Sequence, residues 1–117
     1  MARFLREEIP SATRTATGNV ELNDPWGQAK TIHAGLRVTA ASGTSPSMTV
    51  TVQSTIDDTN WDTILTFTAA TAATHERKSA SIYDSTPVHW GNRLRVVWTI
   101  TGTTPSFTFF INLTGKG

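Results

Sequence analysis

Apolar and polar residues alternate along much of this chain, which is the pattern of strands that bury one face. In the four clearest runs the apolar residues lie two positions apart, and threonine or serine fills many of the positions between them. No segment has convincing helical spacing, so the pattern predicts an all-β protein. The apolar sets are Ile32, Ala34, Leu36, Val38 and Ala40; Met48, Val50 and Val52; Leu94, Val96, Trp98 and Ile100; and Phe107, Phe109, Ile111 and Leu113.

Weaker strand signals and turn signals divide the rest of the chain. Residues 11–22 predict an edge strand or a hairpin, Trp61 opens a strand with Leu65 and Phe67 on its own face, and a further strand runs through residues 78–82. Polar turns are expected at 23–25, 57–60 and 84–87, with a loop at 69–74. About seven to eight antiparallel strands separated by such turns predict a β-sandwich with jelly-roll-like or immunoglobulin-like topology.

One phrase occurs twice, at residues 42–50 and again at 101–109. Each copy reads Gly-Thr-(Ser/Thr)-Pro-Ser at its centre, and each follows a similar strand start, at 36–39 and 94–97. Glycine permits unusual backbone angles and proline fixes φ where a turn passes into a strand. The repeat therefore predicts two hairpin turns, each joining adjacent antiparallel strands.

Composition narrows the function classes. The chain has 117 residues, the size of one domain, and only 16% of them are charged, against about 25% in a typical soluble domain. The net charge of +1 gives no indication of binding to nucleic acid or to an anionic membrane. Cysteine is absent, which excludes disulfides and thiolate chemistry and fits folding in a reducing cytoplasm. No apolar run has the length of a signal peptide or a membrane span, so we expect neither secretion by that route nor membrane insertion.

The histidines give no sign of a metal or catalytic site. His33, His75 and His89 are far apart in the sequence, and none has another histidine at metal-ligand spacing. A Gly-x-Ser-x-Gly nucleophile motif is also absent. We therefore expect a protein that is not an enzyme and that needs no metal or cofactor.

The segment Asp57-Asp58-Thr59-Asn60-Trp61 has two interpretations. Its carboxylates could bind Ca²⁺ and its indole could stack on a sugar ring, as in many β-sandwich binding modules. Alternatively, its polar residues form a turn while Trp61 packs into the core. The segment lacks the ligand spacing and the closing glutamate of a calcium loop, so the structural interpretation is favoured.

Candidate partner-binding residues lie at the N-terminus and at aromatic positions in polar surroundings. Residues 1–11 predict an N-terminal arm in front of a single domain over 12–117, because a segment that mixes apolar and charged residues up to Pro10 cannot bury its apolar side chains against itself. If it is ordered, it docks either on its own domain or on a neighbouring subunit. Trp98 is in register with the core, whereas Trp26 and Trp90 lie in polar, loop-like segments and Phe110 lies on the polar face of its strand. The predicted contact residues are Arg3, Phe4, Leu5, Arg6, Ile9, Trp26, Trp90 and Phe110.

Several motifs, read in order, resemble a family of small structural proteins from tailed bacteriophages. The resemblance covers about residues 12–113, and its specificity comes from the order and spacing of the motifs. The motifs are Arg14-Thr15-Ala16-Thr17, Val38-Thr39-Ala40, Ser45-Pro46-Ser47 followed by Thr49-Val50-Thr51-Val52-Gln53, and Leu94-Arg95-Val96-Val97-Trp98-Thr99.

This resemblance implies a head decoration or cement protein. Such a protein is made in the cytoplasm of the host bacterium, is located on the capsid surface of the virion, and binds the major capsid protein; a homo-oligomer is compatible with that role. The resemblance supplies no catalytic residues. A carbohydrate-binding or host-adhesion module of the phage tail is the alternative.

Overall fold

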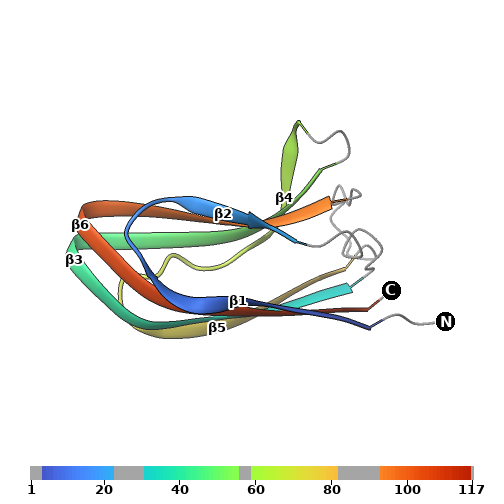
Figure 1. Cartoon of the computed structure of the whole chain (residues 1–117), viewed down its shortest axis with the longest axis horizontal. Helices are drawn as coiled ribbons and strands as arrows, with labels where there is room; N and C mark the ends of the chain where they lie inside the picture. Colours follow the sequence, from blue (N-terminus) through green and yellow to red (C-terminus); the bar gives the residue numbers. More distant parts are fainter. Residues whose placement is uncertain (1–3, 23–30, 56–58, 82–92, 117) are drawn as a thin grey trace.

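The computed structural model describes residues 4–22, 31–55, 59–81 and 93–116, and within these ranges the regular structure is entirely β (Figure 1). The predicted all-β fold class is confirmed. Within the described ranges six antiparallel strands follow one another: β1 (Phe4–Arg14), β2 (Gly18–Glu21), β3 (Thr31–Thr55), β4 (Trp61–Thr66), β5 (Thr74–Ser81) and β6 (Arg93–Lys116).

Two very long strands organise the molecule. β3 has 25 residues and β6 has 24, and they pair with each other from Thr31 opposite Lys116 to Thr55 opposite Arg93. Both strands bend in the middle, so each contributes one half to each of two layers (Figure 1). The two layers are therefore one sheet folded over on itself.

In the part of the chain that the structure describes, each layer contains four strand segments. In the β1 layer the order is β1, the second half of β6, the first half of β3, and β5. In the β2 layer the order is β2, the first half of β6, the second half of β3, and β4. β3 and β6 each pass from one layer to the other, and the edge strands β1 and β2 lie in different layers. This strand order is that of a jelly roll. Of the two predicted topologies, the jelly-roll-like one is observed.

The repeated phrase forms the two bends, not two hairpins. Ser42 pairs with Ser106 and Ser47 with Thr101, so each copy of the phrase lies against the other copy. The backbone has positive φ at Gly43 and Ser45, and again at Gly102 and Thr104. The hairpin prediction was wrong because these residues do not reverse the chain. They bend β3 and β6 from one layer into the other, and the two strands stay paired with each other on both sides of the bend.

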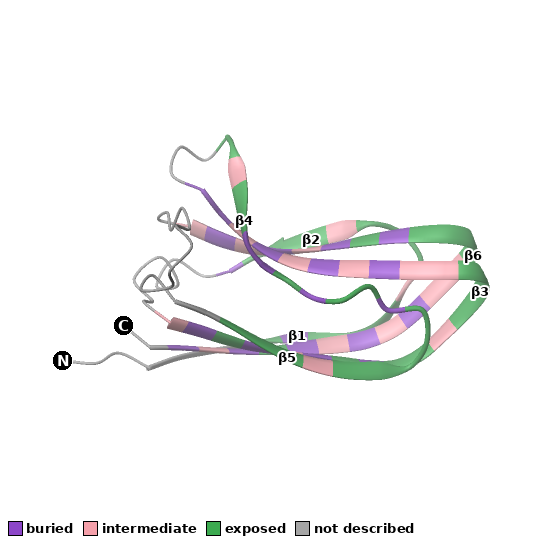
Figure 2. Ribbon diagram, turned by 180° about the vertical axis from the view of Figure 1, so that it is seen from behind, coloured by how far each residue is buried: buried purple, intermediate pink, exposed green. Residues whose placement is uncertain are grey.

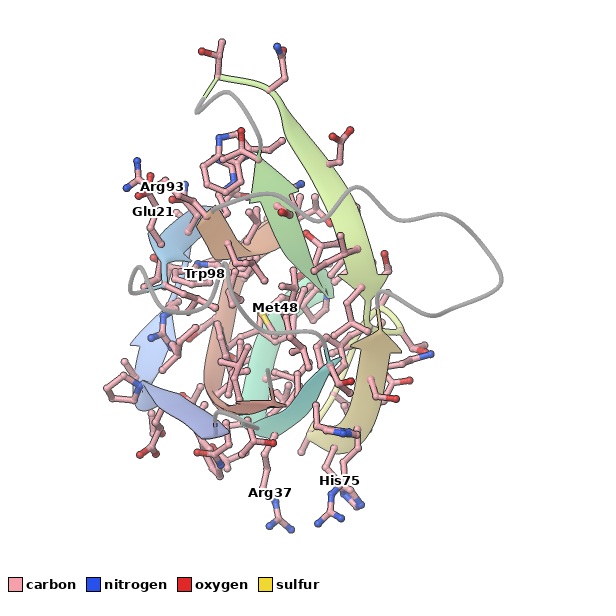
Figure 3. The ribbon with its side chains drawn as sticks, turned by 90° about the vertical axis from the view of Figure 1, so that its right-hand side faces the viewer. Glu21, Arg37, Met48, His75, Arg93 and Trp98 are labelled. Atoms are coloured by element: carbon pink, nitrogen blue, oxygen red, sulfur yellow. The ribbon has the colours of Figure 1, made fainter. Side chains whose placement is uncertain are left out.

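The alternation in sequence correctly predicts the core between the layers. Figure 2 shows buried residues alternating with partly buried or exposed ones along β3 and β6. Met48 is fully buried near the centre of the molecule (Figure 3). Ala40 is the exception to the predicted set: it is exposed, because the pairing of β3 with β6 shifts between Val38 and Ala40.

Trp98 belongs to the core, as predicted, and anchors the edge where β1 passes into β2. Its ring meets Phe109 edge-on with centroids 5.7 Å apart. The Arg14 guanidinium lies 4.8 Å from the Trp98 ring centroid and 4.4 Å from that of Phe109, and it donates hydrogen bonds to the carbonyls of Pro10 and Phe109. Burial lowers the pKa of Arg14 below its ordinary value, whereas the aromatic faces and the carbonyls around it favour the charged guanidinium.

The N-terminal segment is part of the domain. β1 pairs with β6 from Phe4 opposite Lys116 to Arg14 opposite Phe107, with a shift in register between Ile9 and Ala12. The predicted arm is therefore the first part of an edge strand. Ile9 is only 2% exposed and packs in the core. The prediction that Ile9 contacts a partner was therefore wrong: its apolar side chain is satisfied within the same molecule.

Trp61 does not point into the core. Val52 pairs with Leu65 while the next residue, Gln53, pairs with Thr63, which leaves Ile64 as an extra residue in β4. This bulge places both Ile64 and Leu65 in the core and leaves Trp61 partly exposed. The prediction that Trp61 packs into the core assumed strict alternation along this strand. An inserted residue such as Ile64 reverses the alternation, so Trp61 lies on the outer face.

The connection between β4 and β5 is fastened to β5 by Glu76. The backbone NH of Thr68 donates to Oε1 of Glu76 at 2.7 Å, and the Thr68 hydroxyl lies 2.9 Å from Oε2. Lys78 lies 3.8 Å from the same carboxylate. The Thr68 backbone hydrogen bond, together with its hydroxyl and the charge of Lys78, lowers the pKa of Glu76 below its ordinary value.

Replacing Glu76 by glutamine is expected to destabilise the protein by about 0.2–1 kcal/mol at neutral pH, the range of exposed charged contacts. Because the folded-state pKa is lowered, the stabilisation by the carboxylate is present above the unfolded-state pKa, near 4.5, and is lost as the pH falls through the folded-state value. Urea unfolding of Glu76→Gln and wild type at neutral and acid pH measures this, with the exposed Glu8→Gln as control. A difference that persists unchanged in acid would contradict the assignment.

Candidate docking surface

The structure locates some of the predicted contact residues. Arg3, Trp26 and Trp90 lie outside the described residues. Phe4, Leu5 and Arg6 are the first residues of β1, and their backbone pairs with residues 114–116 of β6. Phe110 lies on the outer face of the β1 layer and is partly buried there, which agrees with its predicted place on the polar face of its strand.

Three cross-strand rows define the outer face of the β1 layer. Each row takes one residue from β6, one from β3 and one from β5. Since residues paired in this way point to the same side of a sheet, the nine residues form one continuous surface. The rows are Phe110, Arg37 and His75; Asn112, Gly35 and Arg77; and Thr114, His33 and Ser79.

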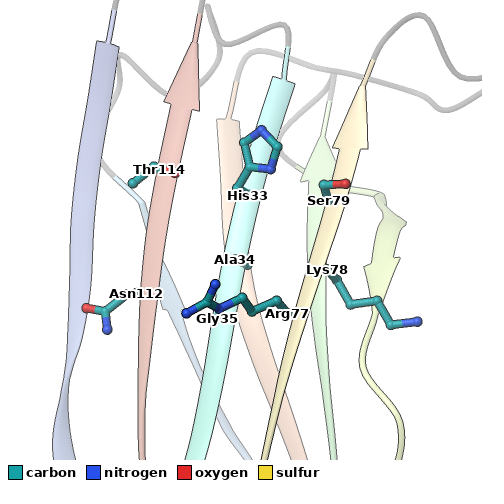
Figure 4. A pocket seen from close by; sticks show the side chains of 8 residues that line it. All are labelled: His33, Ala34, Gly35, Arg77, Lys78, Ser79, Asn112 and Thr114. Carbon is teal, nitrogen blue, oxygen red and sulfur yellow. The ribbon is translucent and has the colours of Figure 1, made fainter.

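Gly35 leaves this surface hollowed. A side chain there would meet only Cγ of Arg77, at 4.0 Å, and Arg77 extends from β5 across Gly35 (Figure 4). A depression of about 490 Å³ is lined by His33, Gly35 and Asn112, among others. A second one, of about 250 Å³, lies beside Phe110 and Arg37. Both hollows are open to solvent.

The charges on this face lack acidic partners. Within the described residues, neither Arg37 nor Arg77 takes part in an ion pair, and Arg37 and His75 point away from the body of the molecule (Figure 3). The acidic residue on the same face is Glu8, which lies opposite Asn112 at the far edge, on β1. The centre of the face is therefore basic.

The outer face of the β2 layer differs, because its basic side chains have partners. Arg93 forms an ion pair with Glu21. Arg95 donates to Gln53 at 2.8 Å, and its guanidinium lies 4.2 Å from the centroid of the Trp61 ring. One face of the Trp61 indole is thus occupied by an arginine. Asp57 and Asp58, which could have formed a ligand site with Trp61, lie outside the described residues.

Sequence reasoning missed the basic face. The alternation of Arg37 and His33 with Leu36 and Ala34 already placed the two basic residues on the outer side of their strand, opposite the core. What the sequence could not supply was the register that brings β5 alongside, with His75 opposite Arg37. His33 and His75, distant in sequence, share this face, whereas His89 lies outside the described residues.

The described part of the chain contains no group of three or more histidine, cysteine, aspartate or glutamate residues placed to hold a metal ion. Among the same residues, no helix has the length and apolarity required to cross a membrane.

Comparisons with known proteins support the fold and leave the role open. No protein-family model matches the chain, and no curated protein matches it. Among solved structures, the chain is similar to a protein of Bacillus endospore appendages, described as a novel family of disulfide-linked pili, with a TM-score of 0.55 and 11% identity over 98% of this chain and 89% of that one. At this identity the likeness concerns the fold alone. The present chain has no cysteine, so it cannot form disulfide links.

Proposed function

We propose that this chain is a non-enzymatic structural protein of a tailed bacteriophage, which decorates the assembled head and holds neighbouring capsid subunits together. The observation that carries the proposal is the ordered series of motifs over about residues 12–113 that resembles the phage structural family. The two-layer jelly roll is compatible with it, since this architecture recurs in viral capsid proteins.

The mechanism is additive. Each copy buries a modest patch across adjacent shell subunits, and many copies together stabilise the shell through avidity. Such a protein needs a firm scaffold and an accessible outer face. The continuous pairing of β3 with β6 supplies the first, and the open face of the β1 layer supplies the second.

Heads purified without this protein provide the test. Added protein is expected to sediment with the heads in a saturable way, with many copies per head, and to raise the temperature at which the heads release their DNA. A protein that leaves heads unoccupied and sediments with tails would contradict the proposal and favour the alternative, an adhesion or carbohydrate-binding module.

A further inference from the structure

Four basic side chains gather at the centre of the outer face of the β1 layer. Arg37 lies directly opposite His75, and Arg77 lies two residues further along β5, diagonal to both Arg37 and His33. Diagonal neighbours on a sheet are about 7–8 Å apart. The two guanidinium groups are therefore close enough to meet one ligand surface together.

The two arginines of this face are like charges without a counter-charge. Arg37 and Arg77 occupy diagonal positions on neighbouring strands, and within the described residues neither forms an ion pair. The same chain does pair its arginines on the other layer, where Arg93 has Glu21 and Arg95 has Gln53 and Trp61. Arg37 and Arg77 therefore carry unpaired charges, in contrast to the arginines of the β2 layer. This contrast suggests that their partners lie on another molecule.

We infer that the outer face of the β1 layer docks on an acidic protein surface, with carboxylates of the partner pairing with Arg37 and Arg77. Arginine is suited to this because its planar guanidinium binds a carboxylate through two hydrogen bonds. Phe110 is partly buried next to Arg37 and adds an aromatic contact, and aromatic residues and arginine are enriched in interface hot spots.

The size and charge of the face favour a protein over a nucleic acid. The molecule measures 47 × 26 × 26 Å, so its broad face can supply the roughly 800 Å² that each partner buries in a standard interface. A nucleic-acid site needs a basic surface that follows a phosphate backbone. Here the nine residues of the three rows include only two arginines, in neighbouring rows, and the net charge of the chain is only +1.

The inference rests on the proposed function, because the acidic surface is taken to belong to the head shell.

The test compares Arg37→Gln/Arg77→Gln with a matched control, Arg93→Gln/Arg95→Gln, which removes the same charge from the opposite layer. The first variant is expected to bind heads at least tenfold more weakly at low salt and to lose most of the salt dependence of wild type. The control is expected to bind like wild type. Equal weakening of both variants, or wild-type binding by the first, would overturn the inference.

A second arm separates this inference from the proposed function. NMR titration of the free protein with a short polyglutamate peptide is expected to shift the amides of residues 33–37 and 75–79, and not those of the β2 layer. Heparin and single-stranded DNA serve as competing probes. If heads do not bind the protein but polyglutamate shifts these amides, the head role fails and the docking face stands. If heparin or DNA shifts them and polyglutamate does not, the assignment to an acidic protein is wrong.

Discussion

Gly43→Ala is expected to lower the free energy of unfolding by about 2–4 kcal/mol, the sum of a strained backbone and a steric overlap. Gly43 has φ of +115°, an angle that side chains disfavour. A Cβ atom there would lie 2.7 Å from the carbonyl oxygen of Thr104 and 2.9 Å from Cα of Pro105. Both contacts are with backbone of the other bend, so relief would require the two long strands to separate where they fold over.

Gly35→Ala is the matched control. The new Cβ would meet only a side-chain carbon of Arg77, at 4.0 Å, and alanine restricts the unfolded chain more than glycine does. Its stability is expected to equal or slightly exceed that of wild type in chemical denaturation. If Gly43→Ala proves as stable as Gly35→Ala, the two copies of the repeat do not pack against each other as described.

Deleting residues 1–10 is expected to destabilise the isolated protein severely. The deletion removes the buried side chain of Ile9 and most of the pairing of β1 with β6, and it uncovers one side of Ile111. Loss of a buried isoleucine alone typically costs about 2–5 kcal/mol, a large part of the roughly 5–15 kcal/mol by which a domain is stable. This expectation is the reverse of the one that follows from a free N-terminal arm.

Ile9→Ala and Glu8→Ala separate packing from a general effect of changing the segment. Ile9→Ala is expected to lower the melting temperature strongly, and Glu8→Ala, whose side chain is exposed, is expected to leave it nearly unchanged. A truncated protein with the melting temperature of wild type would show that β1 contributes little to the fold.

The sequence was sufficient to predict which side of each long strand is buried. Val50 and Phe109 illustrate why: a strand with one face in the core must alternate, and the alternation is visible without knowing the partner strand. Pairing is a separate property that alternation does not encode. The bends at Gly43 and Gly102 therefore looked like hairpin turns, because the same residue types permit a reversal or a bend.

The candidate surface was predictable only in part. Phe110 could be placed on an outer face from its own strand, since its neighbours Phe109 and Ile111 are buried. Its association with Arg37 depends on the register between β3 and β6, and that of Arg37 with His75 on the register between β3 and β5. Trp61 was misplaced by a bulge. For Ile9 the sequence left docking on its own domain and docking on a neighbouring subunit both open, because the pairing of β1 with β6 cannot be read from the segment itself.

If the chain is a phage head protein, as proposed, electron cryomicroscopy of purified virions that contain it tests this central claim most directly. The account predicts repeated jelly-roll density, about the 47 × 26 × 26 Å size of this domain, on the outside of the head, with the face that carries Arg37 and Arg77 turned toward the shell. Density for the chain confined to the tail, or heads that carry no such density in virions shown to contain the protein, would contradict it.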